Sequence, residues 1–267
     1  MELDVATFKI KASPGDRNIL LTNPLTRYFL EKLFYLPEIK KWHSVVSKTH
    51  SAKEFVDTAI AALNVQLAVN PEELNHIPRT GPVLVVANNP SSIDGFSLAS
   101  LMFQARPDVK CIGDTRFNFF PQLKELVIAV DTSKKWNPLA IRSAIRSLNQ
   151  GKLVTVTPAG NLSYFRFNEF KISDPTWNPT IAKLIHATKV PVVPLYRSLK
   201  NSWTYQIARR IHPALGSLLQ PAEFIKKRNA QMNVRIGKLI PYEELAEMDP
   251  LQMTNHLRSK TYSLGEL

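Results

Sequence analysis

Residues 81–95 read Gly-Pro-Val-Leu-Val-Val-Ala-Asn-Asn-Pro-Ser-Ser-Ile-Asp-Gly. The apolar, β-branched run from Pro82 to Ala87 is typical of a buried strand. Polar residues then break the run, and the apolar periodicity of residues 96–102 predicts a helix. A strand, a tight polar turn and a helix start place polar side chains at the carboxyl edge of a sheet, where open α/β sheets bind their ligands.

The same turn has a purely structural interpretation. Ser91 and Asp94 stand three residues apart, which is the spacing of a capping box, and a carboxylate at this place also complements the helix dipole. Spacing alone does not distinguish a helix cap from a ligand site.

The rest of the chain alternates between strand and helix patterns. We expect strands at 65–69, 109–112, 127–130, 153–157, 190–195 and 233–236, and helices at 23–36, 51–63, 119–126, 138–148 and 178–188, with Pro37 ending the first helix. This alternation predicts an α/β fold with a mixed, largely parallel sheet flanked by helices and an N-terminal helical cap. The expected division is an arm and helices at 1–62, an α/β domain at 63–240 and a helical tail at 241–267.

The composition is that of a globular intracellular protein. Hydrophobic residues make up 44% of the 267 residues, enough for a sizeable core. No apolar run has the length of a membrane-spanning helix, and the first residues do not resemble a secretory signal. With Cys111 as its single cysteine the chain forms no internal disulfide, so we expect a cytoplasmic setting and read Cys111 as a core residue.

The charge is strongly and unevenly basic. The chain has 34 Lys and Arg against 22 Asp and Glu, a net charge of +12. Between Arg197 and Lys238 nine basic residues face one acid, Glu223. Such a surface suits an anionic bilayer, an acidic carrier protein or nucleic acid, although an ordinary solvated face has the same charges.

Three further segments follow predicted strands. Residues 157–160, Thr-Pro-Ala-Gly, form a turn after the strand at 153–157. Arg116 lies in the segment 112–121 and offers a forked donor pair to an anion, or an ordinary ion pair with Asp114. Residues 190–196 read Val-Pro-Val-Val-Pro-Leu-Tyr. Each segment alone also fits an ordinary strand end.

Taken in order, these segments resemble the four blocks of the lysophospholipid (glycerolipid) acyltransferase superfamily. The first block of that family is Asn-His, four residues, then Asp-Gly, and here it reads Asn88 to Gly95 with Asn89 in place of the histidine. The Thr157–Gly160 turn is similar to the hemolysin-like and ornithine-lipid acyltransferase branch. The resemblance spans about residues 63–240 and implies the glycerolipid acyltransferase fold.

The resemblance also implies a chemistry. In the family the histidine takes a proton from a hydroxyl or amine acceptor, which attacks the thioester of acyl-CoA or acyl-carrier protein, and the aspartate orients the histidine. Asn89 cannot accept a proton near neutral pH. Asn89 would instead hold the acceptor, with Asp94 as a weak base if burial raises its pKa. The residues expected to bind substrate are Asn88, Ser91, Ser92, Arg116, Thr157, Pro158, Ala159 and Gly160.

Three functions remain open at this point. The first is an active acyltransferase whose acceptor is a lysolipid or a related hydroxyl or amine compound. The second is an inactive relative that binds lipid or acyl-carrier protein. The third, a basic nucleic-acid binder, lacks a recognised module. We expect no cofactor beyond the acyl donor and no metal site, because no His, Cys, Asp or Glu residues have ligand spacing.

Membrane contact, where it occurs, is expected to be peripheral and at the inner face of the membrane. Arg209 and Arg210 flank an apolar set that gives the segment an interfacial pattern, made of Trp203, Tyr205, Ile207 and Ile211.

Overall fold

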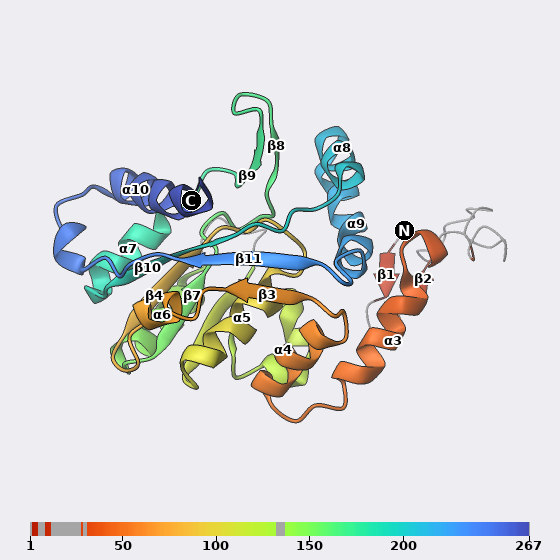
Figure 1. Ribbon diagram of the computed structural model, residues 1–267, viewed down its shortest axis with the longest axis horizontal. Helices are drawn as coiled ribbons and strands as arrows, with labels where there is room; N and C mark the ends of the chain where they lie inside the picture. The colour runs from red at the N-terminus through yellow and green to blue at the C-terminus, as the bar shows by residue number, and fades with distance from the viewer. Residues whose placement is uncertain (1, 5–8, 12–27, 29–30, 132–136, 267) are drawn as a thin grey trace.

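A twisted sheet lies at the centre of the molecule (Figure 1). The computed structural model describes residues 2–4, 9–11, 28, 31–131 and 137–266, and within them this sheet has seven strands in the order β3-β11-β10-β4-β7-β5-β6. Neighbouring strands are parallel except β10 and β11. The strands are β3 (Gln66–Val69), β4 (Val83–Ala87), β5 (Val109–Asp114), β6 (Val127–Val130), β7 (Leu153–Val156), β10 (Val192–Arg197) and β11 (Gln231–Ile236). The predicted largely parallel α/β architecture is confirmed.

Helices cover both faces of this sheet. On one face pack α3 (Leu36–Val46), α4 (Ala52–Ala61) and α5 (Asp94–Ala105), and on the other α6 (Pro138–Asn149), α7 (Thr180–Thr188) and α10 (Pro250–Ser263). The central strand β4 is buried along its whole length. Its side chains alternate between the two cores, Val83, Val85 and Ala87 entering one, Leu84 and Val86 the other. A strand buried on both faces explains the uninterrupted apolar run.

The predicted end of the first helix, at Pro37, is wrong. Most of residues 23–30 lies outside the described part of the chain, but Pro37 begins a helix and does not end one. The break comes at Tyr35, whose φ of 57° is left-handed, and α3 starts at Leu36 with Pro37 in its first turn. Proline suits that position because the first amide groups of a helix have no partner within the helix. In the described part of the N-terminal arm, β1 (Glu2–Asp4) pairs with β2 (Lys9–Lys11).

The helix predicted at 119–126 is wrong. The chain forms two short 3-10 turns instead, η2 (Thr115–Phe119) and η3 (Pro121–Leu123). Aromatic packing fixes this geometry: Phe120 lies 5.0 Å from Phe55 and Phe117 lies 5.6 Å from Phe96, ring centre to ring centre. Burial of these rings outweighs the helical periodicity of the segment.

Several elements have no counterpart among the predicted ones. The hairpin of β8 (Tyr164–Arg166) and β9 (Lys171–Ser173) follows β7, and α8 (Trp203–Ile211) and α9 (Pro213–Ile225) follow β10. The short helices η1 (Glu73–His76), η4 (Tyr242–Glu244) and η5 (Leu264–Glu266) complete the described elements, and η4 and η5 lie within the expected helical tail. Since β7 and β10 are the two neighbours of β4, the hairpin and α8 leave the sheet on either side of the turn that follows β4.

The sheet opens at the carboxyl end of β5. Pairing between β5 and β7 stops at Cys111 and Thr155, whereas β5 continues beside β6 as far as Asp114 and Val130. Strand β7 continues beside β4, with Val156 opposite Val86. Beyond Thr155 the ladder between β5 and β7 therefore ends, and this edge is where the cavity described below is found.

Candidate active site

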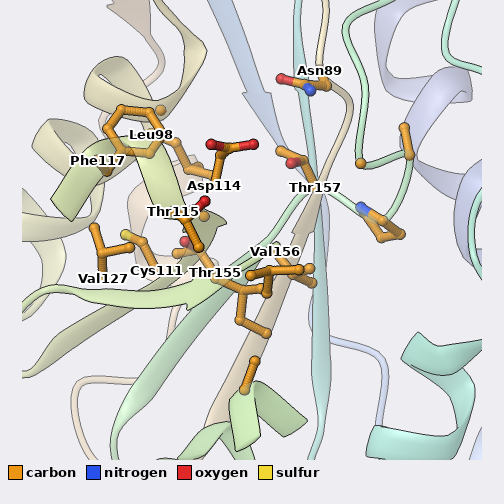
Figure 2. A pocket seen from close by; sticks show the side chains of 18 of the residues that line it. Asn89, Leu98, Cys111, Asp114, Thr115, Phe117, Val127, Thr155, Val156 and Thr157 are labelled. Carbon is orange, nitrogen blue, oxygen red and sulfur yellow. The ribbon is translucent and has the colours of Figure 1, made fainter. Parts of the chain in front are cut away.

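A cavity of about 730 Å³ occupies the opening between β5 and β7 (Figure 2). Its polar lining includes Asn89 from the turn after β4 and Thr157 from the turn after β7. The two polar turns singled out in the sequence therefore face one cavity at one edge of the sheet.

The apolar walls of the cavity lie on both sides of the sheet. Towards α5 the wall consists of side chains of the first core: Val56, Leu98, Ala99, Leu123, Leu126 and Val127. Towards α6 and α7 it consists of Ala140, Ala144, Ile181 and Leu184 of the second core, together with Ile141 of α6. Polar residues also line both sides, Asp131, Asn137 and Thr180 towards α6 and α7, and Asp114, Arg116 and Gln220 towards α5.

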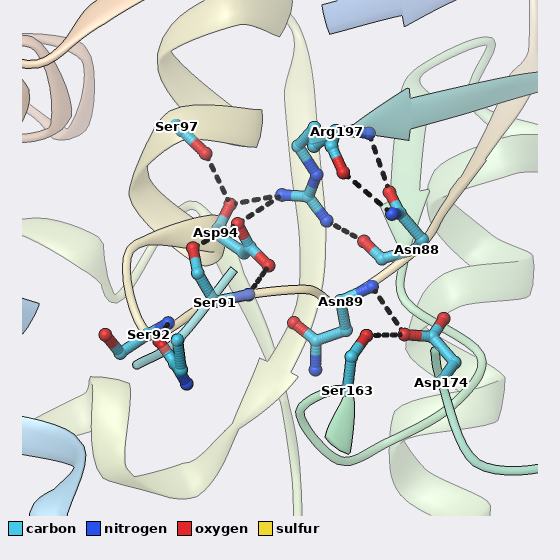
Figure 3. Close-up of polar contacts among 10 residues, drawn as sticks. Asn88, Asn89, Ser91, Ser92, Asp94, Ser97, Ser163, Asp174 and Arg197 are labelled. Atoms are coloured by element: carbon cyan, nitrogen blue, oxygen red, sulfur yellow. Dashed lines mark hydrogen bonds and ion pairs between the residues drawn. The ribbon is translucent and has the colours of Figure 1, made fainter. Parts of the chain in front are cut away.

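Asn89 is held by its backbone and leaves its side chain to the cavity (Figure 3). Its amide N–H donates to Asp174 Oδ1 at 3.0 Å, and its carbonyl accepts from the amide of Ser163 at 2.8 Å. Within the described residues no hydrogen bond is made by its side-chain amide. A carboxamide in this position can donate to a carbonyl and accept from a hydroxyl.

Asp174 is a supporting residue that the sequence analysis missed. Its carboxylate is fully buried and accepts from the amide of Asn89, from Ser163 Oγ at 2.5 Å and from Trp177 Nε1 at 2.8 Å. Burial raises the pKa of Asp174, and these hydrogen bonds oppose the rise. The carboxylate therefore ties β4's turn to the segment before α7. No local sequence pattern indicates this role, because Asn89 and Asp174 are 85 residues apart.

Asp94 faces away from the cavity. Its carboxylate accepts from the Ser91 amide at 2.6 Å and from Ser91 Oγ at 2.9 Å, and only 1% of the residue is exposed. Burial raises the pKa of Asp94 to about 6, although Arg197 and the Ser91 hydrogen bonds act in the opposite direction. Asp94 does not line the cavity. The capping box is not formed, because α5 has Ile93 at its N-cap without a side-chain cap hydrogen bond, and the Asp94 carboxylate instead binds the amide and hydroxyl of Ser91.

Asn88 and Arg197 lock the turn to β10. The Asn88 side chain donates to the Arg197 carbonyl at 2.9 Å and accepts from the Arg197 amide at 2.8 Å. In return the buried Arg197 guanidinium donates to the main-chain carbonyls of Asn88 and Asp94. Burial lowers the pKa of Arg197, while Asp94, 3.8 Å away, raises it. Asn88 is thus a structural member of the motif and does not line the cavity.

The two serines of the turn differ in their surroundings. Ser91 lines the cavity, but its hydroxyl is engaged by Asp94. Ser92 donates its amide to Asn201 Oδ1 at 3.2 Å. Its hydroxyl is buried and has no hydrogen-bond partner among the described residues, and Ser92 lines the cavity.

Arg116 lies at the rim of the cavity with its side chain 69% exposed. Its Nε donates to Asp114 Oδ1 at 2.8 Å and its Nη1 donates to Gln220 Oε1 at 3.2 Å. This is the ion pair that the sequence offered as the alternative to an anion site. The exposed guanidinium still points donors along the rim, where an anionic group could approach it.

The turn at 157–160 lines the cavity with all four of its residues. Gly160 adopts a φ of 65° and donates its amide to the Thr157 carbonyl at 3.0 Å, which closes the turn. The Pro158 carbonyl accepts from the Asn178 amide at 3.0 Å. In Figure 2 Thr157 lies beside Asn89, and Asp114 faces them across the cavity.

No histidine from elsewhere in the chain takes the place of the one that the resemblance led us to expect at position 89. All six histidines lie in the described part of the chain, and none of them lines the cavity. Cys111 lines it, but burial raises the pKa of its thiol to about 11, which keeps it protonated. In the same described ranges no cluster of three His, Cys, Asp or Glu side chains has the arrangement of a metal site.

Comparison with known proteins agrees with this geometry. A family model described as Acyltransferase matches residues 68–198, from β3 to the end of β10, and so includes both turns. No curated protein matches the whole sequence significantly.

The fold has a known relative among solved structures. The crystal structure of the 1-acyl-sn-glycerophosphate (LPA) acyltransferase PlsC from Thermotoga maritima superimposes with a TM-score of 0.53 at 16% identity, over 90% of this chain and 89% of that chain. This likeness confirms the acyltransferase-like fold expected from the four sequence blocks. At this identity it shows the fold and no more.

Proposed function

We propose that this protein binds an acyl thioester, from coenzyme A or an acyl-carrier protein, and transfers the acyl group to a hydroxyl or amine of a lysolipid-type acceptor. The observation that carries the proposal is the cavity itself, which joins a polar mouth at Asn89 and Thr157 to apolar walls. A fatty acyl thioester has the same two parts, a polar reacting group and an apolar chain.

In this arrangement the acyl chain lies along the apolar wall and the thioester carbonyl lies at the mouth. The acceptor oxygen or nitrogen attacks the carbonyl carbon, a new C–O or C–N bond forms, and the C–S bond breaks. The proton that the acceptor loses neutralises the departing thiolate. The Asn89 carboxamide orients the acceptor or the carbonyl, and Arg116 offers its exposed donors to an anionic head group.

The missing histidine sets the expected rate. A positioned general base accelerates such a transfer by roughly a hundred- to ten-thousand-fold, and Asn89 supplies none of this. Asp94, enclosed by Ser91 and Arg197, does not reach the cavity lining. The transfer therefore depends on the proximity of donor and acceptor, and we expect it to be slow.

A second function follows from the same observation. If proximity alone gives no turnover, the protein is an inactive relative that holds an acylated ligand. The absence of any histidine from the described cavity lining favours this alternative.

Radiolabelled acyl-CoA or acyl-carrier protein, incubated with a lysolipid, separates the two. We expect slow transfer by the native protein, a further loss in Asn89→Ala and a gain in Asn89→His. Asn255→His, on the exposed side of α10 and outside the cavity lining, is the matched control and should match the native protein.

Each outcome has a definite meaning. Activity only in Asn89→His makes the native chain the inactive ligand holder. A protein that neither transfers nor binds an acyl thioester, in the native form and in Asn89→His alike, contradicts both functions.

A further inference from the structure

An exposed apolar ridge stands beside the mouth of the cavity. Five large apolar side chains from the β8–β9 hairpin and α8 are turned to solvent: Phe167, Phe170, Trp203, Ile207 and Ile211. Phe170 is 84% exposed, Ile211 71% and Trp203 63%. These five residues, with the exposed Arg210 and Lys171, are called the α8–hairpin surface below. A contiguous group of this kind marks an interaction site more often than single exposed residues do.

Helix α8 is amphipathic in the reverse sense to an ordinary surface helix. Trp203, Ile207 and Ile211 recur every four residues and form the exposed stripe. The buried residues are Tyr205, which is fully enclosed, and Gln206. Tyr205 therefore does not belong to the interfacial set that the sequence suggested, whereas the other three residues do.

The hairpin and α8 form one unit. The Phe165 ring lies 5.7 Å from that of Trp203, and the Phe165 amide donates to Gln206 Oε1 at 3.0 Å. The Arg210 guanidinium lies 5.4 Å from the centre of the Phe167 ring. These contacts hold the exposed side chains of both elements in one ridge.

The charges beside this ridge are positive and not neutralised by accessible carboxylates. Between residues 198 and 228 six Lys and Arg accompany a single acid, Glu223. Glu223 is fully buried, where it accepts from the Ser202 amide and hydroxyl and pairs with Lys226. In the hairpin, Glu169 is already paired with Arg166 at 2.8 Å. An anionic surface therefore meets a positive field here.

The position of the ridge connects it with the candidate active site. The hairpin and α8 follow the two strands that border β4, and Figure 1 shows both extending beyond the sheet on the same side. Helix α9, which continues from α8, contributes Ser217 and Gln220 to the cavity lining. A molecule embedded in a surface that contacts this ridge therefore lies close to the mouth of the cavity.

We propose that the α8–hairpin surface docks on a lipid bilayer that contains anionic lipids. Docking brings a lipid acceptor to the mouth of the cavity, and in this respect the inference rests on the proposed function. The bilayer fits because aromatic and aliphatic side chains occupy the projecting positions and cations flank them, which is the arrangement of interfacial segments. Among the described helices none has the length and apolarity needed to cross a membrane.

Flotation with phospholipid vesicles tests this surface. The native protein should bind vesicles of phosphatidylcholine mixed with phosphatidylglycerol far better than vesicles of phosphatidylcholine alone. Trp203→Gln combined with Ile207→Gln should lower the partition coefficient by about tenfold, because apolar burial at the interface is lost. Arg210→Glu should lower it by at least about fivefold, the effect of one cation near an anionic surface.

The controls use equally exposed positions on other helices. Leu139→Gln combined with Leu251→Gln changes apolar residues on α6 and α10, and Lys183→Glu changes a charge on α7. Vesicle binding should be unchanged in both. Equal losses in the controls, or no loss in the α8 variants, overturn the proposal. Binding to acyl-carrier protein without binding to vesicles overturns it in favour of a protein partner.

An assay of transfer to a water-soluble, short-chain acceptor distinguishes a failure of the docking proposal from a failure of the proposed function. The α8 variants should transfer to that acceptor as the native protein does and lose activity only with acceptors embedded in vesicles. If the native protein binds vesicles through this ridge but transfers nothing, the proposed transfer fails and the docking surface stands.

Discussion

Some polar residues of the turn after β4 hold the turn in place, and others line the cavity. Asn88, Asp94 and Arg197 bond to one another or to the adjoining main chain, and these contacts fix the turn between β4 and β10. Asn89 is fixed only through its backbone. A substitution of the Asn89 side chain should therefore change substrate handling without unfolding the turn, which makes Asn89→His and Asn89→Ala informative.

Asp94 gives the protein a pH-dependent stability that can be measured. Because burial raises its pKa from 3.8 to about 6, the folded state binds this proton more tightly than the unfolded state does. Its contribution to the free energy of unfolding is complete below about pH 4 and is lost as the pH rises through about 6. The size is of order 3 kcal/mol.

We therefore predict different pH slopes for the native protein and Asp94→Asn. In urea unfolding, the native protein should gain stability relative to Asp94→Asn when the pH falls from 7 to 4, because the amide does not titrate. Parallel slopes for the two proteins would show that the carboxyl is not desolvated. Asp94→Ala should be less stable than Asp94→Asn by about 1–3 kcal/mol, because it leaves the buried amide and hydroxyl of Ser91 without an acceptor.

The sequence could predict the residues of the turn but not what holds them. A strand followed by a polar turn is a local pattern, so Asn89, Ser91 and Asp94 could be named in advance. Asp174 is 85 residues from Asn89, and Arg197 is 109 residues from Asn88. Such partners depend on how the sheet is assembled, and one sequence contains no pattern for them.

At the scale of elements, periodicity predicted the buried strands well and the segments beside the cavity poorly. Strands such as β4 are enclosed by both cores, so burial dictates their apolar composition. The segment 115–123 is set by aromatic packing, and α8 carries its apolar stripe outward. The first was mistaken for a helix because its aromatic residues reach the core from short 3-10 turns. The second was not predicted as a helix, although its apolar residues recur every four positions.

The two apolar walls of the cavity lead to a prediction about the donor. We expect the acyl chain to lie along α5, because Leu98, Leu123 and Leu126 of the first core give that wall large aliphatic side chains. Ala99→Leu should lower transfer or binding of long-chain donors relative to acetyl donors. Ala140→Leu, the matched change on α6, should leave this ratio unaltered.

Thermal unfolding provides the control for these variants, because a larger side chain in a packed wall costs typically 1–3 kcal/mol. Equal melting temperatures would assign the change in ratio to the cavity. A loss confined to Ala140→Leu would place the chain on the other side of the sheet.

At the scale of the whole molecule, the sheet order brings the turns after β4, β7 and β10 to one edge. The turn after β4 lies between those after β7 and β10, and the opening between β5 and β7 gives the cavity its apolar depth. The alternation of strands and helices predicted the layers of the fold. The basic composition predicted an anionic partner. The opening could not be predicted, because it depends on where one ladder ends, at Cys111 and Thr155.

The central claim is that the cavity holds the acyl part of a thioester. Calorimetric titration with a non-transferable thioether analogue of palmitoyl-CoA, below its micelle concentration, tests this claim without requiring turnover. Each buried methylene contributes about 0.8 kcal/mol, so burial of about four raises the affinity by roughly two-hundredfold. We predict that the analogue binds at least that much more tightly than coenzyme A and that Ala99→Leu weakens only the analogue. Equal affinities for the analogue and coenzyme A would contradict the account.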